Sequence, residues 1–483
     1  MADLAIIKDF HLGIGPSEFE GNGEITNIDL SWRKGVARIA LEAQTATASV
    51  SLVQFIVANK DVSNQLWAAD DGTRLYRGTA FIPSLWSQAS TLGGAAKGLT
   101  VWKNYVFGFR AAAIDTYGPL DGSAVLTAGW QAIDNDGDWH PSLVGQDDIL
   151  YFGAGRYIGS IQEATGSTFT PGSAGTYIFS PRALDLPATY RTRTLAELGK
   201  NLMIGTWAGV NIDEQKVADI FPWDRVSDSF NLPIKLYDNG IQAMLTVNNL
   251  LYFFAGLKGR LYVTDGTNVQ QLAKIPEQII DLSGDQTLNI YPNSMIEHEN
   301  KILFGVSSGP TSSSLRGRVW AYNLETGGLT IENTIGTGTS VGLNIGALFS
   351  NSVESYILAR RDSSDNYAFD DVVNNSRYSS YSATLTSPYL QLGSNETPVD
   401  ISEIEVFLAR PLRTNEGVRL LYRTDLSAAF TEIATVDFAT YAGTQGENLS
   451  FKLQLKTGIQ IRALLTTGSG ATTSPELIKL VLR

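Results

Sequence analysis

The feature that most constrains this chain is a short apolar segment that recurs seven times along it. Each copy is four residues long, usually lies shortly after Asn or Asp, and often ends in Gly or Ala. The last residues of successive copies are 39 to 54 residues apart. The copies are residues 66–69, 105–108, 150–153, 202–205, 251–254, 302–305 and 356–359.

Several copies are followed by a turn and a second apolar run, as in residues 71–76, 259–263 and 317–320. Two short strands joined by a Gly-containing turn are typical of a β-hairpin. A repeat of roughly 40–50 residues with several strands is typical of a β-propeller, whose blades bury their faces only by stacking in a circle. The seven copies predict about seven blades. The motifs of WD repeats, kelch repeats and sialidase Asp-boxes are absent, so the blade type stays unassigned.

The C-terminal part has a different pattern, in which apolar and polar residues alternate. The alternation is clearest in residues 404–408, 418–423, 451–455 and 459–463, which are separated by turn-rich segments. It predicts an antiparallel β-sandwich of roughly 100 residues. We therefore expect an N-terminal arm or ring-closing segment at 1–45, a propeller at 46–377 and a sandwich at 378–483.

The predicted fold class is all-β, a β-propeller followed by a C-terminal antiparallel β-sandwich. Charged residues make up only 18 % of the chain and Gly is abundant, which suits strands and turns better than helices. One segment is predicted to be helical, residues 192–200, with the sequence Thr-Arg-Thr-Leu-Ala-Glu-Leu-Gly-Lys.

The net charge of −13 predicts repulsion from polyphosphate, and no Lys/Arg-rich run is present. Sequence-specific binding to nucleic acid is therefore not expected. The chain has no Cys, hence no disulfide framework and no thiolate metal site. The N-terminus lacks the pattern of a signal peptide, and the longest apolar stretch, residues 250–257, is too short to span a bilayer. We expect folding in the cytoplasm and no membrane insertion.

One acidic cluster, Asp134-Asn135-Asp136-Gly137-Asp138, has the composition of a cation-binding turn. The carboxylates of Asp134, Asp136 and Asp138 at alternate positions can converge on Ca²⁺, a hard cation that prefers oxygen ligands. The segment departs from an EF-hand because Gly145 occupies the position of the twelfth-residue Glu. The favoured alternative is a solvated Asp/Asn/Gly turn between blade strands. No other cofactor is predicted.

No catalytic motif is convincing. His11, His140 and His298 lie in unrelated contexts without zinc-ligand spacing, and structural roles are favoured for them. Residues 305–309 match the Gly-x-Ser-x-Gly pattern around Ser307, but a nucleophile elbow needs a strand, a turn and a helix. Here Pro310 and a polar loop follow, so a catalytic serine is not expected.

Several segments resemble minor structural proteins of tailed bacteriophages. They are residues 13–15, 28–30, 34–36, 139–143 with 149–153, 186–187 with 202–206, 221–230, 386–393 and 422–423. The resemblance covers most of the chain as loose patterning without a diagnostic motif. A propeller with a C-terminal sandwich is similar to the nozzle or hub proteins of short-tailed phages, which assemble as rings.

The resemblance implies a non-enzymatic virion component made in the host cytoplasm. Its implied partners are further copies of itself, in a symmetric ring, and other tail proteins. An adaptor or fibre-attachment role is equally compatible.

Two alternatives remain. One is a carbohydrate-binding propeller, which would need exposed aromatic residues at matching blade positions. Trp67, Trp207 and Trp320 lie near blade strands but at unequal offsets, which weakens it. The other is a polysaccharide-degrading enzyme, which would need two carboxylates about 5–10 Å apart across a cleft. The sequence singles out no such pair.

Overall fold

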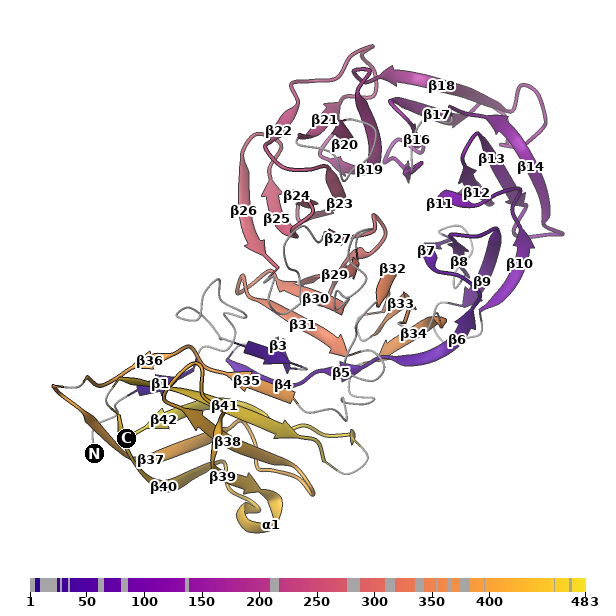
Figure 1. Ribbon diagram of the computed structural model, residues 1–483. Helices are drawn as coiled ribbons and strands as arrows, with labels where there is room; N and C mark the ends of the chain where they lie inside the picture. The colour runs from indigo at the N-terminus through magenta and orange to yellow at the C-terminus, as the bar shows by residue number, and fades with distance from the viewer. Residues whose placement is uncertain are drawn as a thin grey trace.

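The computed structural model is built almost entirely of β-strands, arranged as a ring of small sheets with a second lobe beside it (Figure 1). It describes residues 5–8, 24–26, 28–33, 35–59, 65–79, 86–134, 139–208, 217–275, 287–308, 318–334, 343–352, 355–362, 366–373, 383–394, 396–455, 457–468 and 471–483. The all-β prediction is confirmed.

Seven small sheets stand around one axis, so the ring is a seven-bladed propeller (Figure 1). Blade one contains β7 (Val53–Ala58), β8 (Gln65–Asp70), β9 (Arg74–Thr79) and β10 (Ser87–Thr91). Blade two contains β11 (Ala96–Trp102), β12 (Tyr105–Arg110), β13 (Ala113–Gly118) and β14 (Val125–Ala132). Blade three contains β15 (Ser142–Val144), β16 (Leu150–Ala154), β17 (Tyr157–Glu163) and β18 (Tyr177–Asp185).

Blades four and five have the same four-stranded order from the axis outward. Blade four contains β19 (Tyr190–Leu198), β20 (Asn201–Ala208), β21 (Ala218–Trp223) and β22 (Ile234–Leu236). Blade five contains β23 (Ile241–Val247), β24 (Leu250–Ala255), β25 (Arg260–Thr264) and β26 (Val269–Lys274).

The last two blades each recruit a strand from elsewhere in the chain. Blade six contains β27 (Leu288–Asn289), β28 (Met295–His298), β29 (Lys301–Ser308), β30 (Arg318–Asn323), β31 (Leu329–Thr334) and β5 (Leu41–Glu42). Blade seven contains β32 (Asn344–Ser352), β33 (Ser355–Arg361), β34 (Tyr367–Val373) and β6 (Gln44–Ser49).

All seven recurring segments form the second strand of a blade, and the packing explains their small final residue. A Cβ atom on Gly305 would lie 2.4 Å from Cγ2 of Ile345, which belongs to the inner strand of blade seven. A Cβ atom on Gly205 would lie 2.9 Å from Cγ2 of Ile241 in the inner strand of blade five. The inner strand of the following blade therefore crosses close to these positions, and only a small residue leaves room for it.

The predicted helix at 192–200 is wrong. Residues 190–198 form β19, the inner strand of blade four, in which Thr192, Arg193 and Thr194 are buried. Tertiary packing around the axis overrides the helix-like spacing of the Leu residues, and β-branched Thr favours a strand. The described residues contain one helix, α1 (Phe438–Tyr441), capped by Asp437. No helix there is long and apolar enough to cross a bilayer.

The ring is closed by a strand from near the N-terminus. β6 pairs antiparallel with β34, with Ser49 opposite Tyr367 and Ala48 opposite Ala368. Directly before it, β5 pairs in parallel with β31 of blade six. Blade seven therefore takes its outer strand from residues more than 300 positions away.

The second lobe is a sandwich of two sheets, as predicted. The first contains β1 (Ala5–Ile7), β3 (Ile28–Arg33), β4 (Val36–Ile39), β37 (Val399–Leu408), β40 (Gly446–Leu455) and β42 (Leu477–Leu482). The second contains β2 (Glu24–Thr26), β35 (Ala383–Thr386), β36 (Leu390–Gln391), β38 (Gly417–Arg423), β39 (Thr431–Asp437) and β41 (Gly458–Thr466). Strands before residue 45 thus belong to both lobes.

The sandwich and the propeller share one hydrophobic core. Ile28 and Leu30 of the sandwich belong to the same buried cluster as Leu303, Val319 and Tyr356 of blades six and seven. The backbone N–H of Leu30 also donates to Oγ1 of Thr330 in β31. A continuous apolar junction of this kind holds two lobes as one body, unlike the more polar interfaces of mobile domains.

Buried charges accompany the apolar junction. In the sandwich, Nε of Arg38 lies 2.9 Å from Oδ2 of Asp29, and in blade six Nζ of Lys301 lies 2.8 Å from Oε1 of Glu332. Burial alone would lower the pKa of Lys301, but Glu332, Asp29 and Glu299 raise it above its usual value. The carboxylate of Asp29 therefore stabilises a cation that belongs to the other lobe.

The close packing between blades is tested by Gly305→Ala. The added methyl group meets Ile345 and Ser294, so we expect a loss of about 1–3 kcal/mol of stability and a lower Tm by calorimetry. Gly122→Ala is the control, because its nearest foreign atom to a new Cβ is 3.9 Å away. Equal Tm values for the two variants would contradict this account of the repeat.

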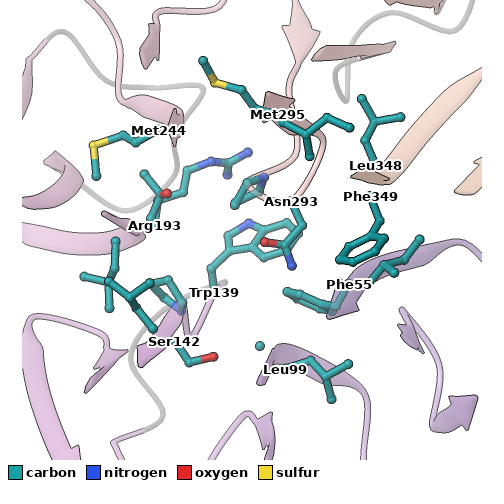
Figure 2. A pocket seen from close by; sticks show the side chains of 18 residues that line it. Phe55, Leu99, Trp139, Ser142, Arg193, Met244, Asn293, Met295, Leu348 and Phe349 are labelled. Carbon is teal, nitrogen blue, oxygen red and sulfur yellow. The ribbon is translucent and has the colours of Figure 1, made fainter. Parts of the chain in front are cut away.

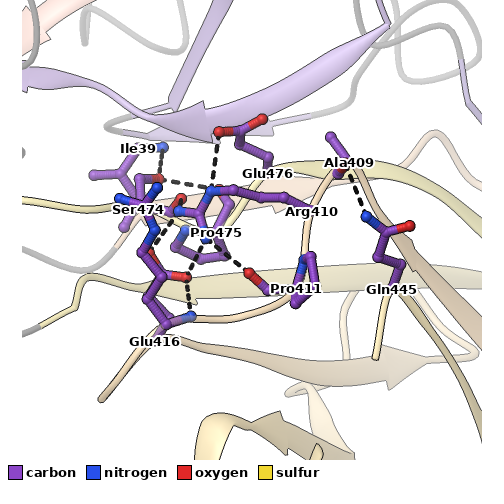
Figure 3. Close-up of polar contacts among 10 residues, drawn as sticks. Ile39, Ala409, Arg410, Pro411, Glu416, Gln445, Ser474, Pro475 and Glu476 are labelled. Carbon is purple, nitrogen blue, oxygen red and sulfur yellow. Dashed lines mark hydrogen bonds and ion pairs between the residues drawn. The ribbon is translucent and has the colours of Figure 1, made fainter. Parts of the chain in front are cut away.

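An arginine-centred cluster fixes the end of the sandwich next to β4 (Figure 3). The guanidinium of Arg410 lies 2.7 and 2.9 Å from the two carboxylate oxygens of Glu416 and 3.2 Å from Oε1 of Glu476. It also donates to the carbonyl oxygen of Ser474, whose Oγ accepts from the N–H of Ile39 at 2.8 Å. The cluster thus links C-terminal loops to an N-terminal strand.

Glu416 supplies a pH-dependent part of this stability. Burial raises the pKa of Glu416, but hydrogen bonds from Arg410 and the Arg413 N–H outweigh it and hold the pKa below its ordinary value. A lowered pKa adds stability above the ordinary value of about 4.3, and this is lost as the pH falls through the folded-state pKa.

We therefore expect Glu416→Gln to cost about 2 kcal/mol at pH 7, with the difference from wild type shrinking below about pH 4. Urea unfolding at several pH values measures it. Glu432→Gln, which removes an exposed partner of Arg419, should change little. A cost for Glu416→Gln that persists unchanged to pH 3 would contradict the assigned electrostatic cause.

Candidate functional site at the propeller axis

The inner parts of all seven blades surround a cavity of about 240 Å³ at the axis (Figure 2). Apolar side chains dominate its lining, as in most sites for small molecules. Its lining residues include Phe55 from β7, Trp139 and Ser142 from the start of blade three, Arg193 from β19 and Asn293 from the segment before β28.

Aromatic side chains meet across the axis. The ring of Trp139 lies 5.7 Å from that of Phe55 and 5.7 Å from that of Tyr291, both at steep angles. These residues come from blades one, three and six, so their contacts bridge the centre of the ring. Burial raises the pKa of Tyr291, which keeps its hydroxyl protonated. Side chains, not an open pore, thus occupy this part of the axis.

Arg193 connects three blades beside the cavity. Its Nε donates to the carbonyl oxygen of Gln242 at 3.2 Å, and its Nη2 donates to Oδ1 of Asn289 at 2.7 Å. Its guanidinium carbon lies 5.4 Å from the ring centroid of Trp139, a cation–π arrangement. Because Gln242 belongs to blade five and Asn289 to blade six, the side chain holds neighbouring inner strands in register.

Two polar side chains face the cavity with unused hydrogen-bonding capacity. Oγ of Ser142 is buried and has no partner among the described residues, and the amide of Asn293 forms no side-chain hydrogen bond within them. Together with Arg193 they give an apolar cavity a few polar contacts. None of the described lining residues is Asp, Glu, His or Lys, so the lining offers binding groups but no acid–base pair.

The predicted Ca²⁺ turn is only partly within the described residues. Oδ2 of Asp134 lies 3.4 Å from Nη2 of Arg182 on the neighbouring strand β18, and Asp136 and Asp138 lie outside the described part. In the described ranges no group of three or more His, Asp or Glu side chains is placed to hold a metal. Ca²⁺ binding by Asp134, Asp136 and Asp138 stays a prediction.

The histidines that are described are buried. His140 lies with Nδ1 3.0 Å from the carbonyl oxygen of Gly153 and Nε2 3.2 Å from that of Ala111. His298 contacts Oγ of Ser350 at 3.0 Å. Burial lowers the pKa of both to about 4, so both are neutral at pH 7. His11 lies outside the described residues.

Ser307 and the tryptophans also have structural surroundings. The Ser307 hydroxyl is buried and exchanges hydrogen bonds with the backbone of Ile345 in the next blade, so it links blades six and seven. Trp67, Trp207 and Trp320 are all buried between strands. Where side chains are described, no Trp is fully exposed to form a platform for a sugar.

The sequence alone does not indicate the axial residues. Trp139 carries no signal of its own within residues 139–143, Arg193 lies in the segment wrongly predicted to be helical, and Asn293 belongs to no motif. They are 54 and 100 residues apart along the chain and meet only because the ring closes. They share one property, a position on or next to the inner strand of a blade. This position can be recognised only after each strand has been assigned to its blade.

No family model and no curated protein matches the chain. Among solved structures, it is similar to the WD40 repeats of RRP9, with 10 % identity over 69 % of this chain and 99 % of that one and a TM-score of 0.46. It is also similar to the computationally designed Ika8 protein, with 10 % identity, 72 % and 96 % coverage and a TM-score of 0.41.

A third similar structure is an exo-β-1,3-galactanase from Phanerochaete chrysosporium, with 10 % identity over 74 % of this chain and 97 % of that one and a TM-score of 0.32. At these identities and TM-scores the similarities carry no information on function.

The axial role of Arg193 is tested by Arg193→Met, which keeps the length of the side chain but removes its charge and donors. Asn289 and the Gln242 carbonyl lose a buried partner, so we expect a cost of about 3 kcal/mol by urea unfolding. Arg191→Met, whose guanidinium donates to backbone near the surface, is the control. A cost no larger than that of the control would contradict the role given to Arg193.

Proposed function

We propose that this chain is a non-enzymatic structural subunit of a bacteriophage tail, a nozzle or hub protein or an adaptor, that assembles into a symmetric ring. The observation that carries the proposal is the core shared by the sandwich and blades six and seven. Two lobes joined in this way form a rigid block, which is the property that a load-bearing ring needs from its subunits. The resemblance of the sequence to tail proteins supplies the context.

The filled axis bears on the path of DNA in such a ring. Phe55, Trp139 and Tyr291 meet at the centre of the propeller, so a DNA duplex does not pass through a single subunit. In the proposed assembly DNA passes through the middle of the ring, between subunits. The net charge of −13 weakens adhesion of DNA to its walls.

The proposal includes no cofactor apart from the predicted Ca²⁺ turn. Its partners are further copies of the chain and other tail proteins, without membrane insertion or sequence-specific binding of nucleic acid. The chain is made in the host cytoplasm and resides in the virion.

A carbohydrate-binding propeller and a polysaccharide-degrading enzyme are the alternatives. The burial of the described tryptophans and the lack of carboxylates in the described cavity lining favour neither.

Light scattering of the purified chain, alone and with tail particles that lack it, tests the proposal. We expect a discrete ring, or a monomer that enters the particles when its neighbour is present. A monomer that never associates with particles, and instead binds or cleaves a glycan on an array, would overturn the structural role.

A further inference from the structure

The axial cavity combines an apolar wall with a volume that fits a small molecule. Side chains of Leu and Met from six blades form much of the wall, namely Leu99, Leu143, Leu195, Met244, Met295 and Leu348. An apolar cavity of roughly 150 Å³ is large enough to bind benzene. The axial cavity, at about 240 Å³, therefore has room for a molecule of about ten non-hydrogen atoms.

Two polar groups on this wall have no partner in the described part of the chain. The amide of Asn293 is directed into the cavity (Figure 2) and forms no hydrogen bond with another described residue. Oγ of Ser142, which lines the same cavity, also has none. A polar group surrounded by apolar side chains costs free energy unless it is hydrogen-bonded, so both groups favour a partner from outside the chain.

A second amide near the axis shows that the fold can satisfy such groups. Nε2 of Gln242 donates to the carbonyl oxygens of Gly256 at 2.8 Å and Leu288 at 3.3 Å. Its Oε1 accepts from the N–H of Ile290 at 2.6 Å. Gln242 therefore has a structural role that uses both ends of its amide. The amide of Asn293 has no such role and remains able to bind a ligand.

The backbone around Asn293 holds its side chain in place before a ligand arrives. The N–H and Oγ of Ser294 both donate to the carbonyl oxygen of Tyr291, at 2.9 and 2.8 Å, which closes a turn over Pro292 and Asn293. The carbonyl oxygen of Asn293 accepts from the N–H of Leu348 in blade seven at 2.8 Å. A site that is ordered in this way loses little entropy when it binds.

The chemistry of the Asn293 amide selects a class of ligand. A side-chain amide offers a donor and an acceptor next to each other. A carboxamide or lactam presents the complementary pair and satisfies both groups at once. A carboxylate offers only acceptors, and a hydrocarbon offers neither, so each leaves part of the Asn293 amide without a partner.

The rest of the lining favours a neutral, flat molecule. The described lining contains no Asp, Glu, His or Lys, and Arg193 directs Nε and Nη2 to Gln242 and Asn289. Phe55, Trp139 and Phe349 present aromatic surface to the cavity, which suits an aromatic ring. The flexible side chains of Met244 and Met295 can adapt to its outline.

We propose that the axial cavity is a binding site for a small neutral aromatic molecule that carries a carboxamide or lactam group. The ring of the ligand lies among the apolar side chains, and its amide edge pairs with the side-chain amide of Asn293. This inference goes beyond the proposed function, because a structural ring subunit needs no ligand, and it does not depend on that function.

Titration calorimetry of the full chain with benzamide, an aromatic carboxamide of suitable size, tests the site. We expect wild type to bind benzamide with a Kd of about 1 mM or tighter, as is typical of a small ligand that fills its pocket. Asn293→Leu removes the donor and the acceptor, so it should weaken benzamide binding at least about tenfold and leave the binding of ethylbenzene, which has no amide, undiminished. The Tm of the ligand-free variant should change little, because the amide has no partner to lose.

Asn231→Leu, which changes an exposed Asn of blade four, is the matched control and should bind benzamide like wild type. If Asn293→Leu does not fold, Asn293→Asp replaces it. This variant only accepts hydrogen bonds, so it should prefer benzamidine to benzamide, the reverse of wild type.

Three results would overturn the site. They are no binding of benzamide by wild type, equal binding by wild type and the Asn293 variant, and tighter binding of benzoate than of benzamide. Assembly with tail particles is measured separately by light scattering, so failure of this site leaves the proposed function standing, and failure to assemble leaves the site standing.

Discussion

Seven blades bury their faces only when the ring is complete, and completion depends on the pairing of β6 with β34. The segment that makes this pair runs without interruption from β4 in the sandwich through β5 in blade six to β6 in blade seven. Separating β6 from β34 would therefore also displace the chain that leads into β4 of the sandwich. Because the pairing joins residues more than 300 positions apart, forming it carries a high loop-closure cost.

The junction between the lobes explains why they act as one body. Apolar contacts supply most of the free energy, since burial from water is not directional and needs only contact area. Buried charges add direction, because the attraction between Asp29 of the sandwich and Lys301 of blade six crosses the junction and depends on how the two lobes are placed. The apolar core makes the junction stable, and the charged groups define a single orientation.

The propeller could be predicted because its repeat has a local cause. The second strand of each blade is largely apolar, and the last residue of the recurring segment within it is small where the next blade crosses, as at Gly205 and Gly305. The sandwich was predictable from alternation, which reports one buried face per strand. The recurring segment and the alternation each involve only a few neighbouring residues, so both can be recognised without knowledge of the fold.

The remaining features depend on contacts between distant segments. β1 pairs with β42, with Ala5 opposite Leu482, and nothing near Ala5 indicates such a partner. Arg193 lies in the segment predicted to be helical, whereas the axis needs an extended strand there. The acidic turn at Asp134 differs, because its local sequence pattern is clear. Its predicted metal-binding role nevertheless depends on the positions of all three carboxylates.

These constraints leave the outer surface as the part of the proposed ring subunit that other proteins can reach. The axis is occupied by aromatic side chains, and the junction between the lobes is a packed core, so neither is available to a macromolecule. A rigid body gains specificity only from groups that already project from it in a fixed geometry.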